Sequence, residues 1–416
     1  MAEMSELDDL VALYRDLHAH PELAFAEHRT AGIVAGRLRS LGYQVTTGVG
    51  GTGVVAVLEN EAGPAVLLRA DMDALPVLEQ TGLDYASTVR TKNAAGEEVP
   101  LMHACGHDMH VSCLLGAAAE LAAQAAAGSW RGRLLLVFQP AEETGAGARA
   151  MVDDGLYERF GHPRVVLGQH VAPMPAGMLG VHPGPAFAAQ DGLRVVLHGL
   201  GGHGSRPESA VDPVLMAAAT VLRLQGIVSR EVGAGDSAVV TVGAMRAGTA
   251  PNIIPAQAEL LLSVRSFDER VRERVLTAIE RIVRAEAAAS GAPAEPEIET
   301  LSTFPAVVND ADACAKLAEV FNAGVGLSLD PGPVTGSEDV GLLATAAGVP
   351  CGYWLVGGAD PALFAGITTV EEARAIVDKL PANHSPLFAP VVEPTLRTGI
   401  AALTAAARAW LAPADG

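Results

Sequence analysis

The chain has 416 residues, of which 50% are apolar and 18% are charged, a composition typical of a folded protein with a large core. Asp and Glu number 48 while Lys and Arg number 28, so the formal net charge is −20. An excess of negative charge this large argues against nucleic acid or an anionic membrane as a partner.

Strand-like apolar runs and helical stretches alternate along the first part of the chain. After an amphipathic helix in the first 30 residues, we expect a helix at 111–127 and strands at residues 44–47, 54–58, 66–69, 134–138 and 165–167. This alternation predicts an α/β domain with a mostly parallel sheet that is covered by helices.

The pattern changes near residue 187. The next segment predicts helices at 212–229 and 268–290, and strands at 193–197, 238–245, 258–267 and 296–300. Asp212 and Pro213 favour a helix start, because an N-cap oxygen precedes a proline that is preset for the first turn. The βαββαβ order predicts a ferredoxin-like domain inserted at residues 187–301. Residues 1–186 and 302–416 would then form the first domain, which ends in an Ala-rich helix.

We expect a cytoplasmic protein. The first ten residues, MAEMSELDDL, have neither the basic start nor the apolar core of a secretory signal. The most apolar long stretch, residues 111–128, contains Glu120 and Gln124 and predicts a buried helix instead of a membrane span. The four cysteines form no CxxC pair, which fits a reducing compartment.

The densest group of metal-capable side chains is the segment HACGHDMH, His103–His110. It places three histidines, one cysteine and one aspartate within eight residues. The alternative is a polar loop with a buried cysteine, but imidazole and thiolate are the commonest transition-metal ligands. Cys105 and His107 are two residues apart, so both side chains can point the same way from a loop.

A second candidate is the carboxylate pair Glu142–Glu143, which follows the apolar strand in RLLLVFQPAEET. Open α/β sheets bind ligands at the carboxyl ends of their strands. Adjacent side chains generally point in different directions, so one glutamate can ligate a metal while the other takes a proton from a metal-bound water. The alternative is a solvated acidic turn.

Ligand-type residues follow other predicted strands as well. His170 follows the run VVLGQ, and Asp71 and Asp73 follow the run VLLRA. His384 in PANHSPLF is a further candidate on a proline-flanked loop. Each alone has a structural explanation, as a satisfied histidine or a turn-capping aspartate, but their recurrence favours one shared metal site.

Other enzyme motifs do not fit. The chain has no HExxH motif and no GxSxG nucleophile elbow. GxGxxG occurs at Gly48–Gly53 and Gly199–Gly204, but neither copy leads directly into the helix that dinucleotide binding requires. His203 in the second copy is either a substrate contact or part of a surface turn.

Together these motifs resemble those of a metal-dependent amidohydrolase family that includes hippurate hydrolases, N-acyl-amino-acid aminoacylases, N-acetyldiaminopimelate deacetylases and auxin-conjugate hydrolases. That family belongs to the aminoacylase/carboxypeptidase class of dinuclear metallopeptidases. The matching segments lie between residues 17 and 390 and include LHAHPELAFAE, RADMDALP, HACGHDMHVSCLLGAA, FQPAEETGAGA, GLGGHGSRPESAVDPV and NHSPLFAP.

The resemblance implies a site for two divalent ions. Their ligands would be Cys105, His107, Glu143, His170 and His384, with the Cys105 thiolate bridging the ions. Glu142 would be the general base, and Asp71 would orient a metal-ligating histidine. The inserted domain would be a lid and dimerisation domain. In it, His203 and Asn252 would bind the substrate's carbonyl or carboxylate, either within one chain or across a dimer interface, and Arg265 would assist at the carboxylate.

The expected function is therefore metal-dependent hydrolysis of the amide bond of N-acyl amino acids. Thiolate favours zinc, cobalt or nickel, whereas imidazole and carboxylate also suit manganese. The expected partners are a small-molecule substrate and further copies of the chain, in a homodimer or higher oligomer. A dipeptidase or aminopeptidase on the same scaffold is the nearest alternative. A catalytically silent metal-binding protein is another, against which the intact Glu142–Glu143 pair argues.

Overall fold

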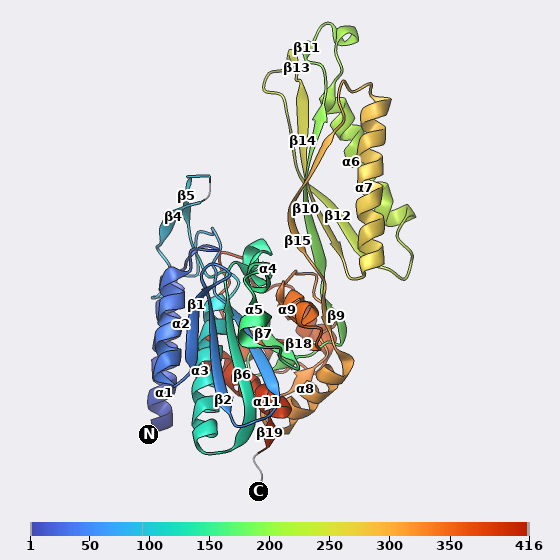
Figure 1. Cartoon of the computed structure of the whole chain (residues 1–416). Helices are drawn as coiled ribbons and strands as arrows, with labels where there is room; N and C mark the ends of the chain where they lie inside the picture. Colours follow the sequence, from blue (N-terminus) through green and yellow to red (C-terminus); the bar gives the residue numbers. More distant parts are fainter. Residues whose placement is uncertain (1, 94, 414–416) are drawn as a thin grey trace. The chain divides into compact units, whose positions relative to one another are not determined.

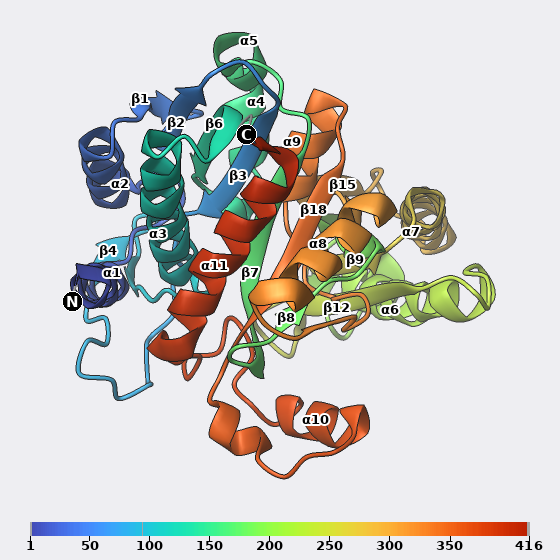
Figure 2. The ribbon, with the colours of Figure 1, turned by 90° about the horizontal axis from the view of Figure 1, so that it is seen from below.

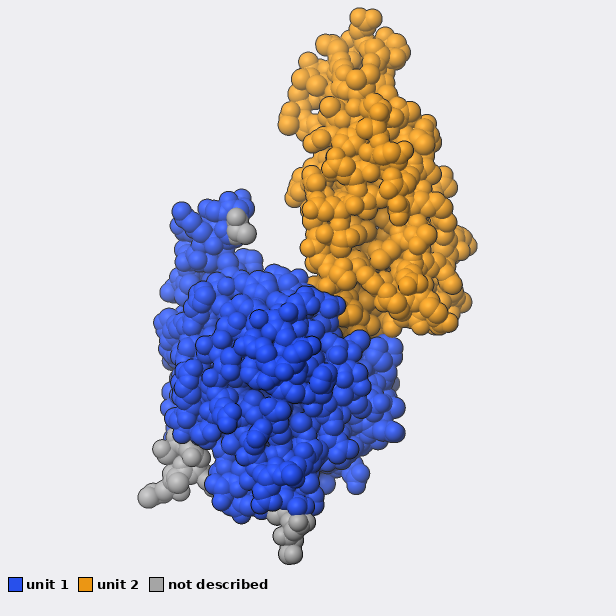
Figure 3. Space-filling view, viewed as in Figure 1, with its two compact units in different colours: residues 1–186, 308–332, 339–416 blue, residues 187–307, 333–338 orange. Residues whose placement is uncertain are grey.

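The structure is a computed structural model that describes residues 2–93 and 95–413. The chain divides into two compact units (Figure 3). Unit 1 comprises Met1–Ala186, Val308–Gly332 and Asp339–Gly416, and unit 2 comprises Phe187–Val307 and Pro333–Glu338.

The observed boundaries differ from the expected division after residue 301. Strand β15 (Glu297–Phe304) pairs with β10 (Ala189–His198) as far as Phe304, so it extends beyond the expected strand. A distant segment also joins unit 2, because the N–H of Ala188 hydrogen-bonds the carbonyls of Val334 and Gly336.

Unit 1 is built on one large mixed sheet. Within the described residues the sheet has nine strands, in the order β1-β2-β6-β3-β7-β18-β8-β17, with β19 paired to β6. Strands β6, β3, β7 and β18 are parallel, whereas β1 and β2 extend the sheet in an antiparallel manner. The strands are β1 (Gln44–Val49), β2 (Gly53–Asn60), β3 (Ala65–Asp71), β6 (Trp130–Gln139), β7 (Val166–Pro175), β8 (Leu179–Gly180), β17 (Ser328–Leu329), β18 (Cys351–Ala359) and β19 (Ala412–Pro413).

Helices cover both faces of this sheet. On one face α3 (His107–Ala126) and α11 (Val392–Trp410) pack against each other, and α4 (Gly147–Asp153) and α9 (Val340–Ala347) lie on the other (Figure 2). Strand β3 shows both environments: Leu68 packs in the core with α3 and α11, while Arg69 reaches Asp339 at the start of α9. The other helices of unit 1 are α1 (Ala2–Ala19), α2 (His28–Ser40), α5 (Leu156–Phe160), α8 (Ala311–Gly324) and α10 (Val370–Val377).

The packing of α3 on α11 depends on a glycine. A Cβ on Gly116 would lie 2.5 Å from Cδ1 of Ile400, so a larger residue would push the helices apart. Leu114 and Leu396 are fully buried in the core around this contact. Burial of one such leucine contributes roughly 1.5–3 kcal/mol, which stabilises the packing of α3 on α11.

Unit 2 contains a second, antiparallel sheet. Its strand order is β12-β14-β10-β15, with β12 (Ala238–Ala247) at one end and β14 (Gln257–Ser266) next to it. Helices α6 (Pro213–Arg230) and α7 (Glu269–Ala289) pack on one face (Figure 1). The chain order βαββαβ with this strand order is that of a ferredoxin-like split motif. Shorter elements of unit 2 are β11 (Gly202–His203), η2 (Pro207–Ser209) and β13 (Ile253–Ile254).

The predicted α/β class is confirmed by the fold. One placement differs: His170 was expected just past a strand, but it lies inside β7, which continues along β18 beyond the end of its pairing with β3. The remaining short elements are β4 (Arg90–Lys92), β5 (Glu98–Pro100), η1 (Glu142–Thr144), β9 (Gly184–Phe187), β16 (Val307–Asn309) and η3 (Pro361–Phe364). In the part of the chain that the structure describes, no helix is long and apolar enough to span a membrane.

Candidate metal centre

Two predicted ligands, Cys105 and His107, lie at the N-terminal end of α3. Gly106 between them has a φ of 82°, and a Cβ there would lie 2.3 Å from Cγ1 of Val171 on β7. Only glycine fits this turn without strain. Both ligand side chains are buried, beside residues that follow the carboxyl ends of parallel strands, where α/β sheets bind their ligands.

The carboxylate pair Glu142–Glu143 lies in the short turn η1 after β6. Ala141 enters the turn with a φ of 51°, and its N–H donates to the buried Glu27 carboxylate at 2.8 Å. The N–H groups of Glu142 and Glu143 donate to the two carboxylate oxygens of Asp73, both at 3.0 Å. Asp73 therefore fixes the backbone that directs both glutamates.

The five predicted ligands come together in unit 1. Cys105 Sγ lies 3.5 Å from His170 Nε2, and His384 Nε2 lies 3.3 Å from Glu143 Oε2. Two groups of three contain Cys105, one with His107 and His170 and one with Glu143 and His384, and in each group the ligand atoms lie within 4.8 Å of one another. Cys105 thus stands where one sulfur can serve two ions.

The predicted base lies at the edge of the same cluster. Glu142 Oε2 lies 3.8 Å from Nε2 of His107, and Oε1 of Glu143 lies 3.9 Å from that nitrogen. The side chain of Glu142 is 5% exposed and that of Glu143 is 9% exposed. The two adjacent carboxylates therefore share a nearly dry environment.

Buried polar atoms in the cluster test whether a metal ion would fit. Nδ1 and Nε2 of His107 and Oε1 of Glu143 have no hydrogen-bond partner among the described residues. Leaving a buried polar group unpaired costs about 1–3 kcal/mol, so these atoms need a partner. The surrounding thiol, imidazole and carboxylate groups are the donors that divalent transition metals prefer, and an ion fits this cluster.

The electrostatics of the cluster also favour bound positive charge. Burial opposes a charge on His107, but the nearby carboxylates, Asp71 first among them, raise its pKa to about 10. Burial raises the pKa of Glu143 to about 8. Either a proton or a metal ion can supply the missing charge, so metal binding here would release protons.

His170 is prepared to act as a neutral ligand. Burial, together with His110, holds its pKa well below the ordinary value for histidine. Its Nδ1 donates to the carbonyl of Val171 at 2.8 Å, which leaves the lone pair on Nε2, the atom that faces Cys105.

Asp71, predicted to orient a ligand histidine, contacts His110 at its Nδ1 at 2.6 Å and the buried Arg69 at 2.5 Å. His110 Nε2 accepts the N–H of Val171 at 2.8 Å, so both ring nitrogens of His110 are engaged within the protein. Nδ1 of His107 instead lies 3.4 Å from Asp73. Asp71 thus orients His110 through a hydrogen bond and also lies 3.7 Å from Nε2 of His107, so Asp71 and Asp73 flank the two nitrogens of the His107 ring.

The predicted substrate contacts His203, Asn252 and Arg265 lie in unit 2. The N–H of Gly204 donates to the carbonyl of Asn252 at 2.8 Å, so His203 and Asn252 lie on neighbouring segments. Nδ1 of His203 accepts the N–H of Ser205 at 3.1 Å, which places the ring proton on the exposed Nε2.

Arg265 on β14 is half-buried, and its Nη1 already has partners in unit 2. It donates to the carbonyl of Thr335 at 2.7 Å and to the hydroxyl of Ser337 at 3.0 Å. Any contact with a substrate carboxylate would have to use the other N–H groups of the guanidinium.

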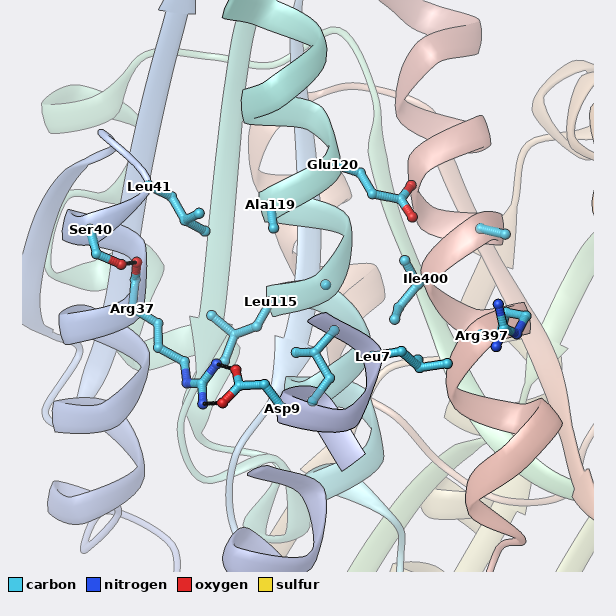
Figure 4. Close-up of a pocket in the computed structure, with 13 residues that line it drawn as sticks. Leu7, Asp9, Arg37, Ser40, Leu41, Leu115, Ala119, Glu120, Arg397 and Ile400 are labelled. Carbon is cyan, nitrogen blue, oxygen red and sulfur yellow. Dashed lines mark hydrogen bonds and ion pairs between the residues drawn. The ribbon is translucent and has the colours of Figure 1, made fainter. Parts of the chain in front are cut away.

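A pocket elsewhere in unit 1 has no comparable chemistry. It has a volume of about 690 Å³, lies between α1, α2, α3 and α11, and contains none of the predicted ligands (Figure 4). Arg37 at its rim pairs with Asp9 at 2.5 Å, and Glu120 accepts the hydroxyl of Thr404 at 2.9 Å. Because these charged groups are already paired, we assign the chemistry to the metal-ligand cluster.

Comparisons with known proteins identify the family. Residues 67–381 match the model of peptidase family M20/M25/M40. The chain belongs to this family. It is 39% identical to the hippurate hydrolase of Campylobacter jejuni, over 78% of this chain and 82% of that protein. It is also 39% identical to the N-acyl-L-amino acid amidohydrolase of Geobacillus stearothermophilus, over 69% and 75% of the two chains.

A solved structure agrees with this assignment. The Bacillus subtilis YXEP protein, described as a dinuclear metal-binding peptidase of family M20, is 29% identical, with a TM-score of 0.75 over 97% of this chain and 99% of that one. The family resemblance expected from the motifs is thus confirmed. This M20 chain is a metal-binding hydrolase that acts on amide bonds.

Three residues near the ligands had no role assigned from the sequence: Asp73, His110 and Asn383. A signal for His110 existed, because it lies three residues after His107 and therefore on the same face of α3. Asn383 carried no such signal. Its contacts are with Cys105 and Val171, both more than 200 residues away in the chain.

Proposed function

We propose that this M20 hydrolase cleaves the amide bond of N-acyl amino acids with the help of two divalent metal ions. The ions would be held by Cys105, His107, Glu143, His170 and His384, and would be zinc, manganese, cobalt or nickel. The observation that carries the proposal is the membership of Cys105 in two separate ligand groups, which supports a thiolate bridge between two ions.

The bound ions would supply Lewis acidity, which polarises the amide carbonyl and makes a water molecule more acidic. Glu142 would take the proton of the attacking water on its carboxylate and later deliver it to the leaving nitrogen. Its position supports this role, because η1 is held by Asp73 and the carboxylate is almost fully buried. Glu143 would remain with the ions, so the two glutamates divide the work.

Residues of unit 2 would complete the substrate site. The Nε2–H of His203 is exposed and would donate to the carbonyl or carboxylate of the substrate, with Asn252 beside it. Arg265 would contribute through the guanidinium N–H groups that Thr335 and Ser337 do not use. Unit 2 would thereby act as the lid domain that the family resemblance implies.

We further propose a homodimer formed through unit 2. The strand β12 lies at one end of its sheet and exposes Val239 and Met245. On α6, Leu215 is 70% exposed and Leu222 is 77% exposed. An open strand edge beside exposed leucines is typical of a surface that another copy covers.

Peptide hydrolysis on the same scaffold is the second candidate. A relative that is 34% identical over 85% of this chain is named thermostable carboxypeptidase 1, from Saccharolobus solfataricus. A dipeptidase or aminopeptidase would need a site that accepts a free amino group, whereas an aminoacylase accepts an acylated one. Substrate preference therefore separates the two functions.

The test is a substrate panel assayed with zinc, manganese or cobalt and with a chelator. Hippurate and N-acetyl, long-acyl and indole-acetyl amino acids are compared with free-amine dipeptides. We expect kcat/KM for one class of N-acyl amino acid to be at least about 100-fold higher than for the free-amine dipeptides, because an amine buried without a partner is costly. We also expect the chelator to abolish turnover. Preference for dipeptides, or turnover that survives the chelator, would contradict the proposal. Glu142→Gln, expressed and purified like the wild type, is the control for activity from contaminating host hydrolases.

A further inference from the structure

Asn383, the residue before the ligand candidate His384, holds together three segments that carry ligands. Its side-chain amide donates to the carbonyl of Cys105 at 3.2 Å and to the carbonyl of Val171 at 3.1 Å. Its nitrogen also lies 3.9 Å from Cys105 Sγ, within reach of a weak N–H···S contact. One amide thus links the loop before α3, strand β7 and its own loop.

The carbonyl of Val171 connects Asn383 with the tautomer of His170. This oxygen accepts two donors, Nδ1 of His170 at 2.8 Å and the Asn383 amide at 3.1 Å. The first of these bonds places the lone pair of His170 on Nε2, toward the Cys105 sulfur. Asn383 therefore supports the carbonyl that selects this tautomer.

The backbone at His384 needs such support. His384 has a φ of 71°, a left-handed conformation that residues other than glycine rarely adopt. Its N–H donates to the carbonyl of Ala104 at 2.8 Å, and the Asn383 amide bonds the next carbonyl, that of Cys105. Two adjacent hydrogen bonds thus fix the backbone at His384 against the loop that carries Cys105.

We propose that Asn383 is a positioning residue of the metal centre, which sets the spacing of Cys105, His170 and His384 and thereby the affinity and ligand field of the bound ions. This inference rests on the proposed function, because it takes these three residues as ligands. Asn383 acts through the ligands and has no role as a ligand or in proton transfer.

The experiment uses Co²⁺, whose thiolate charge-transfer absorption reports directly on a cysteine–metal bond. Co²⁺ is added to the metal-free full-length protein, and its dissociation constant is measured by competition with a chelator. The variants are Asn383→Ala, which removes the amide, and Asn383→Asp, which keeps the size but replaces the donor with a negatively charged acceptor. Asn309→Ala is the matched control, because its buried amide also bridges two carbonyls, of His182 at 2.9 Å and Tyr353 at 2.8 Å.

We expect both Asn383 variants to bind Co²⁺ about 10- to 100-fold more weakly than the wild type and to show a shifted or weakened charge-transfer band. At saturating Co²⁺, kcat should fall more than KM rises, because Asn383 positions ligands and does not bind substrate. Asn309→Ala should lower the thermal unfolding midpoint but leave Co²⁺ affinity and spectrum as in the wild type.

Two results would overturn the inference. One is wild-type Co²⁺ affinity and spectrum in both Asn383 variants, and the other is an equal change in Asn309→Ala, which would indicate a general loss of stability. The Co²⁺ spectrum of the wild-type protein distinguishes failure of this inference from failure of the proposed function. If the wild-type protein shows no thiolate–cobalt band, the Cys105 centre itself is wrong, whereas a normal wild-type band that the Asn383 variants share refutes only the role of Asn383.

Discussion

The two adjacent glutamates of η1 have different surroundings, and this difference can be tested one residue at a time. Both carboxylates lie within 4 Å of His107 Nε2, but of the two only Glu143 also belongs to the group with Cys105 and His384. We expect Glu142→Gln to keep its metal and to lose about 10²- to 10⁴-fold in kcat, the usual contribution of a general base. Elemental analysis and steady-state kinetics measure both quantities.

Glu143→Gln is the contrasting variant for this prediction. It should lose metal, because it removes a charged oxygen from the cluster, and turnover should fall with the metal content. Full turnover in a metal-replete Glu142→Gln protein would show that another group takes the proton.

His18 on α1 provides a prediction for pH dependence. Its buried imidazole lies 2.7 Å from Asp108 and 3.1 Å from Glu79. Burial opposes the charge on His18, but these two carboxylates outweigh it and raise its pKa to about 10. The pKa of the folded state thus exceeds the ordinary value of 6.5, and the folded state holds a proton that the unfolded state releases.

The stability that protonated His18 contributes should be fully present below pH 6.5 and should be lost as the pH rises through about 10. Nitrogen-15 NMR of the histidine rings measures the protonation directly, with His18→Gln identifying the signal. We expect an imidazolium at pH 8. A neutral ring at that pH would show that Asp108 and Glu79 do not outweigh burial.

At the residue scale, the sequence identified candidate ligands better than their supporting residues. Cys105 and His107 stand out because ligand-type residues are dense in their segment. The sequence assigned a role to Asp71 but none to Asp73, because the contact of Asp73 with the η1 backbone depends on the turn after β3. Contacts between distant segments, as with Asn383, leave no pattern in a single sequence.

At the scale of elements, the start of α3 depends on Gly106. Gly106→Ala would place a methyl group 2.3 Å from the Val171 side chain and strain a backbone with a φ of 82°. We expect a loss of about 1–3 kcal/mol in the free energy of unfolding. Metal content should also fall, because relief of the clash with Val171 would change the positions of Cys105 and His107 relative to each other.

Gly128, just after the other end of α3, supplies the control. It has a φ of 67°, but a Cβ there meets nothing within 4 Å. Gly128→Ala therefore reports the backbone strain alone, and chemical denaturation of both variants isolates the contact with Val171. Equal losses and equal metal contents in the two variants would refute the steric explanation.

The elements were largely predictable where burial imposes a pattern. Strand β6 was expected at residues 134–138 and spans Trp130–Gln139, because sheet pairing extends beyond its apolar run. Helix α3 was expected from residue 111 but begins at His107. The polar ligand residues of its first turn resemble a loop in sequence, and their burial in helical form depends on contacts with β3, β7 and η1.

For the whole molecule, the main prediction concerns assembly through unit 2. Leu222→Glu places a charge on the exposed face of α6 and should shift a dimer to monomers. Light scattering coupled to size-exclusion chromatography measures the mass. Thr277→Glu on the exposed side of α7 is the control and should leave the mass unchanged. A monomeric wild type, or a dimer that persists in Leu222→Glu, would contradict the assignment of this surface.

The division into units was visible in the sequence only in part. The βαββαβ order stood out near residue 187, because each element has its own apolar period. Residues 333–338 join unit 2 through hydrogen bonds to Ala188 and Arg265. Hydrophobic periodicity in the sequence does not predict such contacts. The cytoplasmic location stays a prediction.

The proposed metal centre depends on one sulfur shared by two ions. The most direct measurement is a crystal structure of the metal-loaded protein with anomalous data collected at the absorption edge of the metal. We predict two peaks, each about 2.3 Å from Cys105 Sγ if the metal is zinc, one near His107 and His170 and the other near Glu143 and His384. Peaks away from these residues, or ions that Cys105 does not contact, would contradict the account.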